Sequence, residues 1–421
     1  MTTVSIKPNN LRGSIKIPPS KSMSHRAIIC ASLAEGESVV SNLIFSKDIE
    51  ASIGAMQALG AEFERGEDFV IVNGIKSKTE EKCTIDCNES GSTIRFMIPI
   101  AAALSAKARF VGNGRLVDRP LDLYAEIFRA KNMDYAYSGK LPFEVNSQLK
   151  TGKYEIRGDV SSQFISGLLF ALPLLDGDSQ IEIVGNFESK AYVDLTLSAL
   201  DDFGVAIEKN EKNRYIIEGN QKYNGRNYRV EGDYSQGAFW LVAGCIGNGL
   251  VCKDLSVNSL QGDKEVLDIL KRMGAKLKIS DDDIEIFSSE TKGTIIDASE
   301  CPDLIPVLCV LAALSDGETR VINGQRLRIK ESDRIKSTVS ELSKLGADIV
   351  ETEDGMIIQG KKTLSGGKVS SWNDHRIAMA LAIASIRCNS AVVIEGNESV
   401  SKSYPGFFED FVSLGGEIAY G

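Results

Sequence analysis

One pattern of elements recurs about every 70 residues along the chain. Each copy has a strand-like segment, a helix that ends in a glycine turn, and a further strand-like segment. The helix-ending glycines are Gly60, Gly204, Gly274, Gly346 and Gly415, with Asn132-Met133 at the degenerate position between the first two. Glycine suits the residue after a helix because it adopts left-handed backbone angles without steric cost. We therefore expect six copies of one unit in the 421 residues.

Each unit also contains an apolar segment that predicts a second helix. The segments lie within residues 94–104, 164–175, 238–246, 304–314 and 376–386. They are apolar on nearly all sides, and helices of that kind are buried. Polar turns precede several of them, so their N-termini would bring positive dipole ends together. Six units around two centres predict two lobes with an anion-binding cleft between them.

Residues 18–27 predict one such anion site. Two prolines end a strand over residues 14–17, and the apolar run from Ala27 to Ala34 predicts a helix. Ser20, Lys21 and Ser22 then lie near the helix N-terminus, where hydroxyls, backbone N–H groups and cations suit a phosphate or carboxylate. The alternative is an ordinary capped helix with solvated cations.

Composition restricts the partners. The length and the 43% hydrophobic content indicate a globular protein of two or three domains. A net charge of -10 argues against nucleic acid as the main partner, because a phosphate-backbone binder needs a broad basic face. The cations in polar junctions instead favour a small polyanion; they are Lys21, Arg26, Arg95, Arg119, Arg328, Lys330, Arg334, Arg376 and Lys402.

The cysteines and the N-terminus indicate a cytoplasmic protein. The N-terminal residues lack the apolar core of a signal peptide and the character of a transit peptide, and no run is long enough to span a bilayer. The eight cysteines lie mostly in apolar runs, which is typical of reduced core residues. The alternative interpretation is that Cys83 and Cys87 bind a metal, but no second Cys or His pair accompanies them. We expect no membrane association and no metal.

Two further patterns bear on chemistry. Glu331 lies among cations, next to Lys330 and near Arg334, directly before a predicted helix. A solvated face is the usual interpretation of alternating charges, but the density of cations favours a carboxylate tuned for proton transfer. The two histidines, His25 and His375, each precede an arginine at the start of a predicted buried helix, which favours a ligand site over two core histidines. No nucleophile triad or Walker loop is present.

Six motifs together resemble the EPSP synthase family of enolpyruvyl transferases. They occur in the family's order and extend over nearly the whole chain, at residues 19–27, 90–95, 118–120, 161–164, 330–334 and 374–380. The UDP-N-acetylglucosamine enolpyruvyl transferases share the repeat architecture but lack the Ser-Lys-Ser-x-Ser-His-Arg opening. They are the second candidate.

The resemblance implies a two-lobed, inside-out α/β barrel of six βαβαββ repeats. Lobe one would comprise residues 1–13 and 230–421, lobe two residues 14–229, with the active site in the cleft between them. The implied reaction transfers the carboxyvinyl group of phosphoenolpyruvate to the 5-hydroxyl of shikimate 3-phosphate, in the shikimate pathway of aromatic amino acid biosynthesis. It proceeds by addition and elimination and needs no metal or organic cofactor. We expect a monomer.

The resemblance also assigns residues. Shikimate 3-phosphate would be held by Lys21, Ser22, Arg26, Ser161, Ser162, Gln163, Ser189, Tyr192, Asp303 and Lys330. Phosphoenolpyruvate would be held by Lys21, Gly91, Arg119, Gln163, Arg334, His375, Arg376 and Lys402. Asp303 matches the proton acceptor for the 5-hydroxyl, Glu331 the acid and base at the enol carbon, and Lys21 also belongs to the catalytic set. Two polyanions repel one another in a dry site, so several fixed cations are a physical requirement.

Two positions depart from many relatives. Glu89 stands where many carry Asn, and Arg326 stands where some carry an Asn that touches the shikimate phosphate. Both leave glyphosate sensitivity open, and Arg326 is not assigned as a ligand. A catalytically silent metabolite sensor on the same scaffold is disfavoured, because Asp303 and Glu331 are both present.

Overall fold

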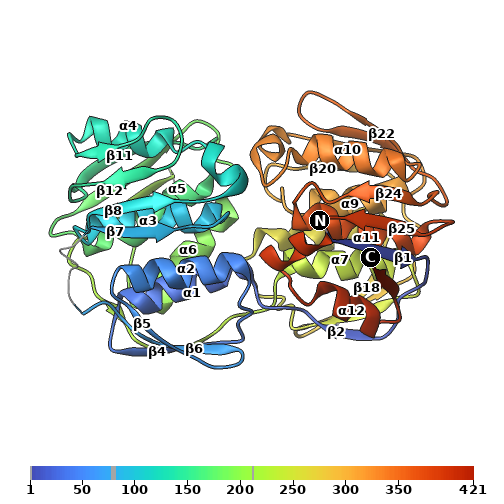
Figure 1. Ribbon diagram of the computed structural model, residues 1–421, viewed down its shortest axis with the longest axis horizontal. Coiled ribbons are helices and arrows are strands. Elements are labelled where there is room, and N and C mark those ends of the chain that lie inside the picture. The colour runs from blue at the N-terminus through green and yellow to red at the C-terminus, as the bar shows by residue number, and fades with distance from the viewer. Residues whose placement is uncertain (1, 77–81, 211–212) are drawn as a thin grey trace. The chain divides into compact units, whose positions relative to one another are not determined.

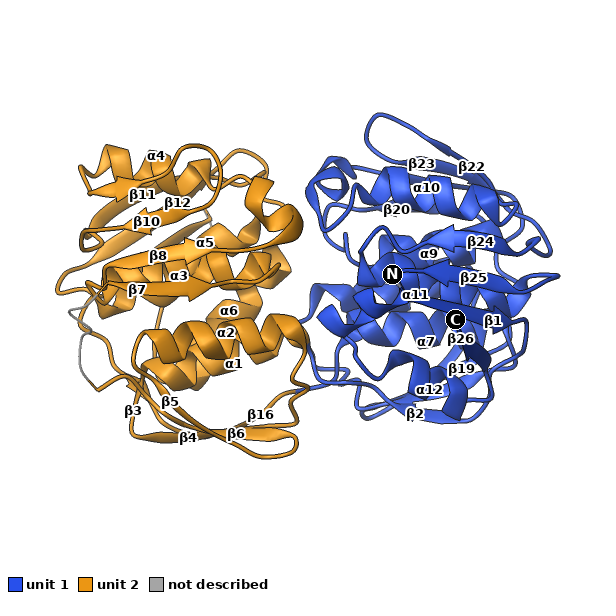
Figure 2. Ribbon diagram, viewed as in Figure 1, with its two compact units in different colours: residues 1–20, 231–421 blue, residues 21–230 orange. Residues whose placement is uncertain are grey.

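The computed structural model describes residues 2–76, 82–210 and 213–421. The chain divides into two compact units, unit 1 with residues 1–20 and 231–421 and unit 2 with residues 21–230 (Figure 2). Each unit has its own apolar core. The predicted boundaries lie near these, but β2 (Ser14–Lys16) pairs in parallel with β17 (Leu250–Lys253). This strand therefore belongs to unit 1, and the chain enters unit 2 only after Ser20.

Unit 2 contains three repeats. The first consists of α1 (Lys21–Leu33), β4 (Glu37–Ser41), α2 (Lys47–Ala58), β5 (Glu62–Arg65), β6 (Phe69–Asn73) and the distant strand β16 (Asn227–Arg229). The second consists of β7 (Cys83–Asp86), α3 (Gly91–Ala103), β8 (Ala108–Val111), α4 (Asp122–Ala130), β9 (Tyr135–Ala136) and β10 (Phe143–Val145). The third consists of β11 (Gly152–Arg157), α5 (Ser162–Ala171), β12 (Ser179–Val184), α6 (Lys190–Asp202), β13 (Glu208–Asn210) and β14 (Arg214–Ile217). A short parallel pair joins β3 (Ala34–Glu35) to β15 (Tyr223–Asn224).

Unit 1 also contains three repeats (Figure 1). The first consists of β2, α7 (Tyr234–Ile246), β17, α8 (Glu265–Arg272), β18 (Lys276–Ser280) and β19 (Asp283–Phe287). The second consists of β20 (Ile295–Asp297), α9 (Ile305–Ala313), β21 (Glu318–Ile322), α10 (Arg334–Lys344), β22 (Asp348–Glu351) and β23 (Met356–Gln359). The third consists of β24 (Gly367–Ser370), α11 (His375–Ala384), β25 (Val392–Glu395), α12 (Phe407–Ser413), β26 (Glu417–Tyr420) and β1 (Thr3–Lys7).

All six repeats build the same kind of sheet. In the described residues each of these four-stranded sheets has one parallel pair followed by two antiparallel neighbours, as in the order β7-β8-β10-β9. Strands from the far end of the sequence complete three sheets: β16 pairs with β4, β2 with β17, and β1 with β25. Parallel strands need a crossover, and in four of the sheets a single buried helix supplies it, as α3 does between β7 and β8. The predicted α/β class and the six βαβαββ repeats are confirmed; the sheets are open ones.

The repeat glycines have the predicted backbone. Gly60, Gly204, Gly274, Gly346 and Gly415 all have positive φ, between 81° and 105°. The degenerate position has Asn132 at φ 50°, and asparagine tolerates this region better than most side chains. Each turn reverses the chain from a helix into the next strand.

The predicted apolar helices form the cores. In unit 2, α3 packs on α5, and in unit 1, α7, α9 and α11 contact one another. Every residue of α7, α9 and α11 is buried. Sheets on the outside and apolar helices inside leave the polar helix N-termini as the places where charged side chains reach the interior. These termini carry the candidate site.

Candidate active site

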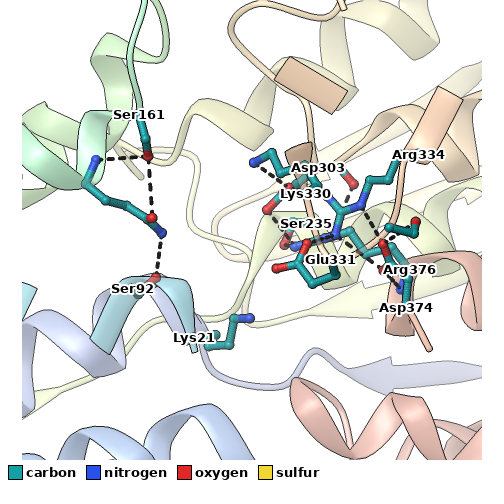
Figure 3. A network of polar contacts seen from close by, with 12 residues as sticks. Lys21, Ser92, Ser161, Ser235, Asp303, Lys330, Glu331, Arg334, Asp374 and Arg376 are labelled. Atoms are coloured by element: carbon teal, nitrogen blue, oxygen red, sulfur yellow. Dashed lines mark hydrogen bonds and ion pairs between the residues drawn. The ribbon is translucent and has the colours of Figure 1, made fainter. Parts of the chain in front are cut away.

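Arg334 is the centre of the charged cluster in unit 1. It is the first residue of α10, and its side chain is 1% exposed. Nη1 donates to Asp303 at 2.7 Å, Nη2 to Glu331 at 2.7 Å, and Nε to Asp374 at 2.9 Å (Figure 3). The planar guanidinium suits this role because it offers its donors in a fixed fork. One cation therefore joins three carboxylates from different segments of unit 1.

Asp303 contacts two further cations. It precedes α9, and its side chain is 22% exposed. Nη2 of Arg376 donates to it at 2.9 Å, and Nζ of Lys330 at 3.4 Å. Burial alone would raise the pKa of Asp303, but the charges of Arg376, Lys330 and Arg334 outweigh it and hold the pKa well below the usual range. Burial also lowers the pKa of Lys330.

Asp374 is the N-cap of α11 and is fully buried. Its carboxylate caps the helix by accepting from the Arg376 backbone N–H at 3.0 Å, and it accepts from Ser332 at 3.0 Å. His375 follows it, also buried, with Nδ1 at 3.8 Å from the Asp374 carboxylate. Arg376 then donates to Ser235 at 3.0 Å. The helix N-terminus thus presents a buried arginine, as the sequence pattern predicted.

The two residues before Asp374 have a strained backbone. Trp372 and Asn373 both have φ 55°, in the left-handed region. Such conformations cost of order 1–3 kcal/mol for a residue other than glycine, so the surrounding structure must hold them. Nζ of Lys402 donates to the Asn373 carbonyl at 2.8 Å. The turn therefore places Lys402 as well as Arg376.

In unit 2, the N-terminus of α1 carries the predicted cations. Lys21 pairs with Asp48 at 2.9 Å, both largely buried. Arg26, 3% exposed, donates to the Ser22 carbonyl at 2.7 Å, the Tyr192 carbonyl at 2.7 Å and Thr196 at 2.9 Å. Burial lowers the pKa of Arg26 to about 10, which leaves it charged at neutral pH. Arg26 thereby ties α1 to α6.

The N-termini of α3 and α5 are joined by Gln163. Nε2 of Gln163 donates to Ser92 at 2.8 Å (Figure 3). Oε1 of Gln163 accepts from Nη1 of Arg95 at 2.8 Å. Ser161 caps α5 by accepting from the Gln163 backbone N–H. Ser162 and Ser189 are buried at the starts of α5 and α6.

Gly91 and Arg119 lie against one another at the start of α3. A Cβ built at Gly91 would collide with the Arg119 guanidinium, and it would come within 3.1 Å of Arg95. Ser90 caps the helix by accepting from the Thr93 backbone N–H at 3.2 Å. The glycine therefore lets a cation approach the helix N-terminus closely, where an anion is favoured.

His25 lies in the core of unit 2. The sequence pattern had favoured a ligand role for it over a core position. Nδ1 lies 2.7 Å from the Ser52 hydroxyl, which lies 2.8 Å from the Thr93 hydroxyl, and Thr93 donates to Ser90 at 2.7 Å. Burial, together with the charges of Lys21 and Arg26, lowers the pKa of His25 well below its usual value, so the ring is neutral. His25 supports the cap of α3.

The structure thus brings the predicted residues together in groups, one set on each unit. Asp303, Lys330, Glu331, Arg334 and Arg376 form one network on unit 1, and Gln163 with Ser161, Arg26 with Ser22 and Tyr192, and Gly91 with Arg119 form smaller ones on unit 2. The sequence prediction did not include Asp48, Arg95, Ser235 or Asp374 among the site residues. Asp374 could have been found as the N-cap before His375-Arg376. Arg95 was recognised as a cation in a polar junction but was not assigned to a substrate.

Glu89 and Arg326 are the two positions that depart from many relatives. The carboxyl group of Glu89 lies over Gly114, where a Cβ would meet it at 2.7 Å. The charge of Arg326 contributes to lowering the pKa of Lys330, after burial and Arg334. Arg326 therefore acts on the electrostatics of an assigned residue, Lys330.

Three features of the described residues bear on other classes of site. No group of three or more His, Cys, Asp and Glu side chains there is arranged to hold a metal ion. No helix there combines the length and the apolar character that crossing a membrane requires. All eight cysteines are free thiols, and Cys83 is the only one of them that is not buried.

Repeated α/β units with carboxylates held among buried cations define a two-unit α/β enzyme for small anionic molecules. A family model for EPSP synthase (3-phosphoshikimate 1-carboxyvinyltransferase) matches residues 6–411. The chain belongs to this family of transferases.

Individual relatives agree with the family match. A protein of Clostridium kluyveri named 3-phosphoshikimate 1-carboxyvinyltransferase is 52% identical over 419 residues, which is 99% of this chain and 98% of that protein. One of the same name from Clostridium perfringens is 54% identical over 99% of both chains. A solved structure of EPSP synthase from Acinetobacter baumannii superposes with a TM-score of 0.84 at 28% identity and covers 100% of both chains.

Proposed function

We propose that this protein transfers the carboxyvinyl group of phosphoenolpyruvate to the 5-hydroxyl of shikimate 3-phosphate and releases phosphate. Family membership and the names of the relatives support this reaction. The observation that carries it in the site is the joint attachment of Asp303 and Glu331 to Arg334, at 2.7 Å each. Two carboxylates available for proton transfer lie among cations that can hold an anion.

The proposed chemistry gives each carboxylate a separate proton-transfer role. Glu331 donates a proton to the methylene carbon of phosphoenolpyruvate, and the 5-hydroxyl oxygen attacks the adjacent carbon while Asp303 accepts the hydroxyl proton. The resulting tetrahedral intermediate then loses phosphate, which leaves with the proton that Asp303 had accepted, and the methyl group returns a proton to Glu331 as the double bond re-forms. The cations stabilise the negative charges that move during both steps.

The pairing of Asp303 suggests how its basicity is restored. In the described structure three cations hold its pKa well below the usual range, which makes it a poor base. Two of them, Arg334 and Arg376, are the cations that we assign to phosphoenolpyruvate. An anionic substrate that draws these cations toward itself weakens their hold on Asp303, so its pKa rises and it can accept a proton.

We further propose that the residues of both units form one active site, in a cleft between lobes as the family resemblance implies. Shikimate 3-phosphate would be bound by Lys21, Ser22, Arg26, Ser161, Ser162, Gln163, Ser189, Tyr192, Asp303 and Lys330. Phosphoenolpyruvate would be bound by Lys21, Gly91, Arg119, Gln163, Arg334, His375, Arg376 and Lys402. The burial of Arg26, Arg334 and Arg376 supports this assignment, because a buried cation interacts strongly with a bound anion.

The protein is proposed to act as a monomer in the cytoplasm, without a metal or organic cofactor. Eight free cysteines are typical of a reducing compartment. Size-exclusion chromatography with light scattering checks the oligomeric state.

Phosphate release from phosphoenolpyruvate tests the reaction. The purified protein is assayed with and without shikimate 3-phosphate, in the presence of a chelator. Release that requires the shikimate ester and is unaffected by the chelator is the expected result. Release that instead requires UDP-N-acetylglucosamine would assign the sister activity, and no release with either acceptor would favour a metabolite sensor.

A further inference from the structure

Glu341 is a buried carboxylate outside the assigned site. It lies on α10, two turns after Arg334, and is 0% exposed. Five hydrogen bonds reach it: two from Lys344 at 2.8 Å, and one each from Trp372 Nε1 at 2.8 Å, the Ser370 backbone N–H at 2.8 Å and Ser340 at 3.0 Å. Burying a carboxylate is costly unless it is fully hydrogen-bonded. Glu341 and its hydrogen-bond partners therefore hold one another in position.

The hydrogen bonds from Ser370 and Trp372 hold both ends of the short segment 370–372 against Glu341. Ser370 is the last residue of β24, and Trp372 is the first of the two consecutive residues with left-handed backbone angles. Trp372 is a bulky side chain, for which φ 55° is unfavourable without outside support. Glu341 provides that support through the indole N–H, while the Trp372 backbone N–H bonds to Ser370 Oγ at 3.2 Å.

This turn places cations of the site. The Asn373 carbonyl accepts from Lys402, and the Asp374 carboxylate accepts from Arg334. Asp374 is also the N-cap of α11 and accepts from the backbone N–H of Arg376 in the first turn of that helix. Arg334 in turn starts the helix that carries Glu341. Glu341 therefore links α10 to the turn by a second connection, separate from the Arg334–Asp374 ion pair.

We propose that Glu341 is a positioning residue for phosphoenolpyruvate, acting through the Trp372–Asn373 turn to hold Arg334, Arg376 and Lys402 in one arrangement. The proposal rests on the proposed function, which assigns these three cations to phosphoenolpyruvate. None of the bonds of Glu341 reaches a residue that is assigned to shikimate 3-phosphate alone. Arg334 and Arg376 also bond Asp303, which is assigned to shikimate 3-phosphate, so losing Glu341 is expected to weaken phosphoenolpyruvate binding more than shikimate 3-phosphate binding.

Glu341→Gln tests this inference, because glutamine keeps the shape but cannot accept from all five donors. The KM for phosphoenolpyruvate is expected to rise roughly tenfold, as for other residues that orient binding groups from behind, while the KM for shikimate 3-phosphate changes less than about twofold. Ser340→Ala is the matched control. It removes one of the five bonds and leaves those from Lys344, Trp372 and Ser370, so both KM values stay near wild type.

Tryptophan fluorescence gives a readout that is independent of turnover. The sequence contains only Trp240 and Trp372, so a Trp240→Phe background reports on Trp372 alone. Adding Glu341→Gln to this background is expected to shift the emission to longer wavelength, because the indole loses its partner and becomes more exposed. Asn373→Gly, which removes the steric cost of one left-handed residue, is expected to restore part of the phosphoenolpyruvate affinity.

The outcomes separate the possibilities. A wild-type protein without carboxyvinyl transfer would refute the proposed function itself. With an active wild type, unchanged KM values in Glu341→Gln, or equal rises for both substrates, would overturn the positioning role. Should Glu341→Gln fail to fold, Trp372→Phe removes only the indole donor, and the same split between the two KM values decides.

Discussion

Nη1 of Arg334 donates to the Asp303 carboxylate at 2.7 Å, so the proposed base is held by a cation that is assigned to a substrate. The same arginine, 1% exposed, also bonds Glu331 and Asp374. The two proposed proton-transfer residues and the N-cap of α11 are thus bonded to one guanidinium, which is itself proposed to bind phosphoenolpyruvate. The consequences differ for activity, stability and pH, and each can be measured separately.

Asp303→Asn should reduce kcat roughly 100- to 10,000-fold, because an amide cannot accept the hydroxyl proton. Circular dichroism should stay native, although the amide offers one acceptor oxygen where the carboxylate offered two, so only one of Arg334 and Arg376 keeps its bond. The exposed Asp281→Asn is the control and should leave kcat unchanged. Wild-type kcat in Asp303→Asn would remove this residue from the mechanism.

Arg334→Ala should destabilise unit 1 by about 3–5 kcal/mol, because Asp374 would remain as a buried charge without its ion-pair partner. Urea unfolding followed by fluorescence measures the change. Arg334→Lys keeps the charge but not the fork of donors, so part of the loss should persist. Equal stability of Arg334→Ala and wild type would contradict the central role of this residue.

Gly91→Ala should raise the KM for phosphoenolpyruvate about tenfold with little effect on folding, since the new methyl group displaces the flexible Arg119 side chain rather than backbone. Gly54→Ala is the matched control in α2. A Cβ there meets no atom within 4 Å, so activity should be unchanged. The two substitutions are compared in steady-state kinetics with each substrate varied in turn.

His25 should make the stability depend on pH below about 6.5, its pKa in the unfolded chain. The native state keeps it neutral because its pKa is lowered, while the unfolded state binds a proton. Stability is therefore lost as pH falls, by up to about 1.4 kcal/mol per pH unit for one group. His25→Gln should show a shallower decline between about pH 7 and pH 5 in urea unfolding, and the two proteins should run parallel above about pH 7. Parallel curves below about pH 6.5 would show that His25 does not contribute.

Much of the fold followed from local sequence signals. The glycines at the ends of repeated helices, the apolar segments and the polar turns before them are patterns within a few residues, and the described structure confirms each. The lobe boundary that the family resemblance implied differs at β2, which it placed in lobe two and which pairs with β17 of unit 1. Strand pairing between distant segments depends on packing that no local pattern encodes.

The site shows the same division. Lys21, Arg26, Arg334 and Arg376 were identifiable from their place at predicted helix N-termini. Their partners were not: Lys21 bonds Asp48, 27 residues away, and Arg334 bonds Asp374, 40 residues away.

The sequence by itself determined the six repeats, the buried helices and the cations at their polar ends, because periodicity and helix termini depend on neighbouring residues. Only the tertiary structure decided that His25 is a core histidine, that one arginine gathers three carboxylates, and that Glu341 holds the strained turn at Trp372. These depend on which side chains share a buried space, where every charge and polar group needs a partner that the fold alone brings within reach.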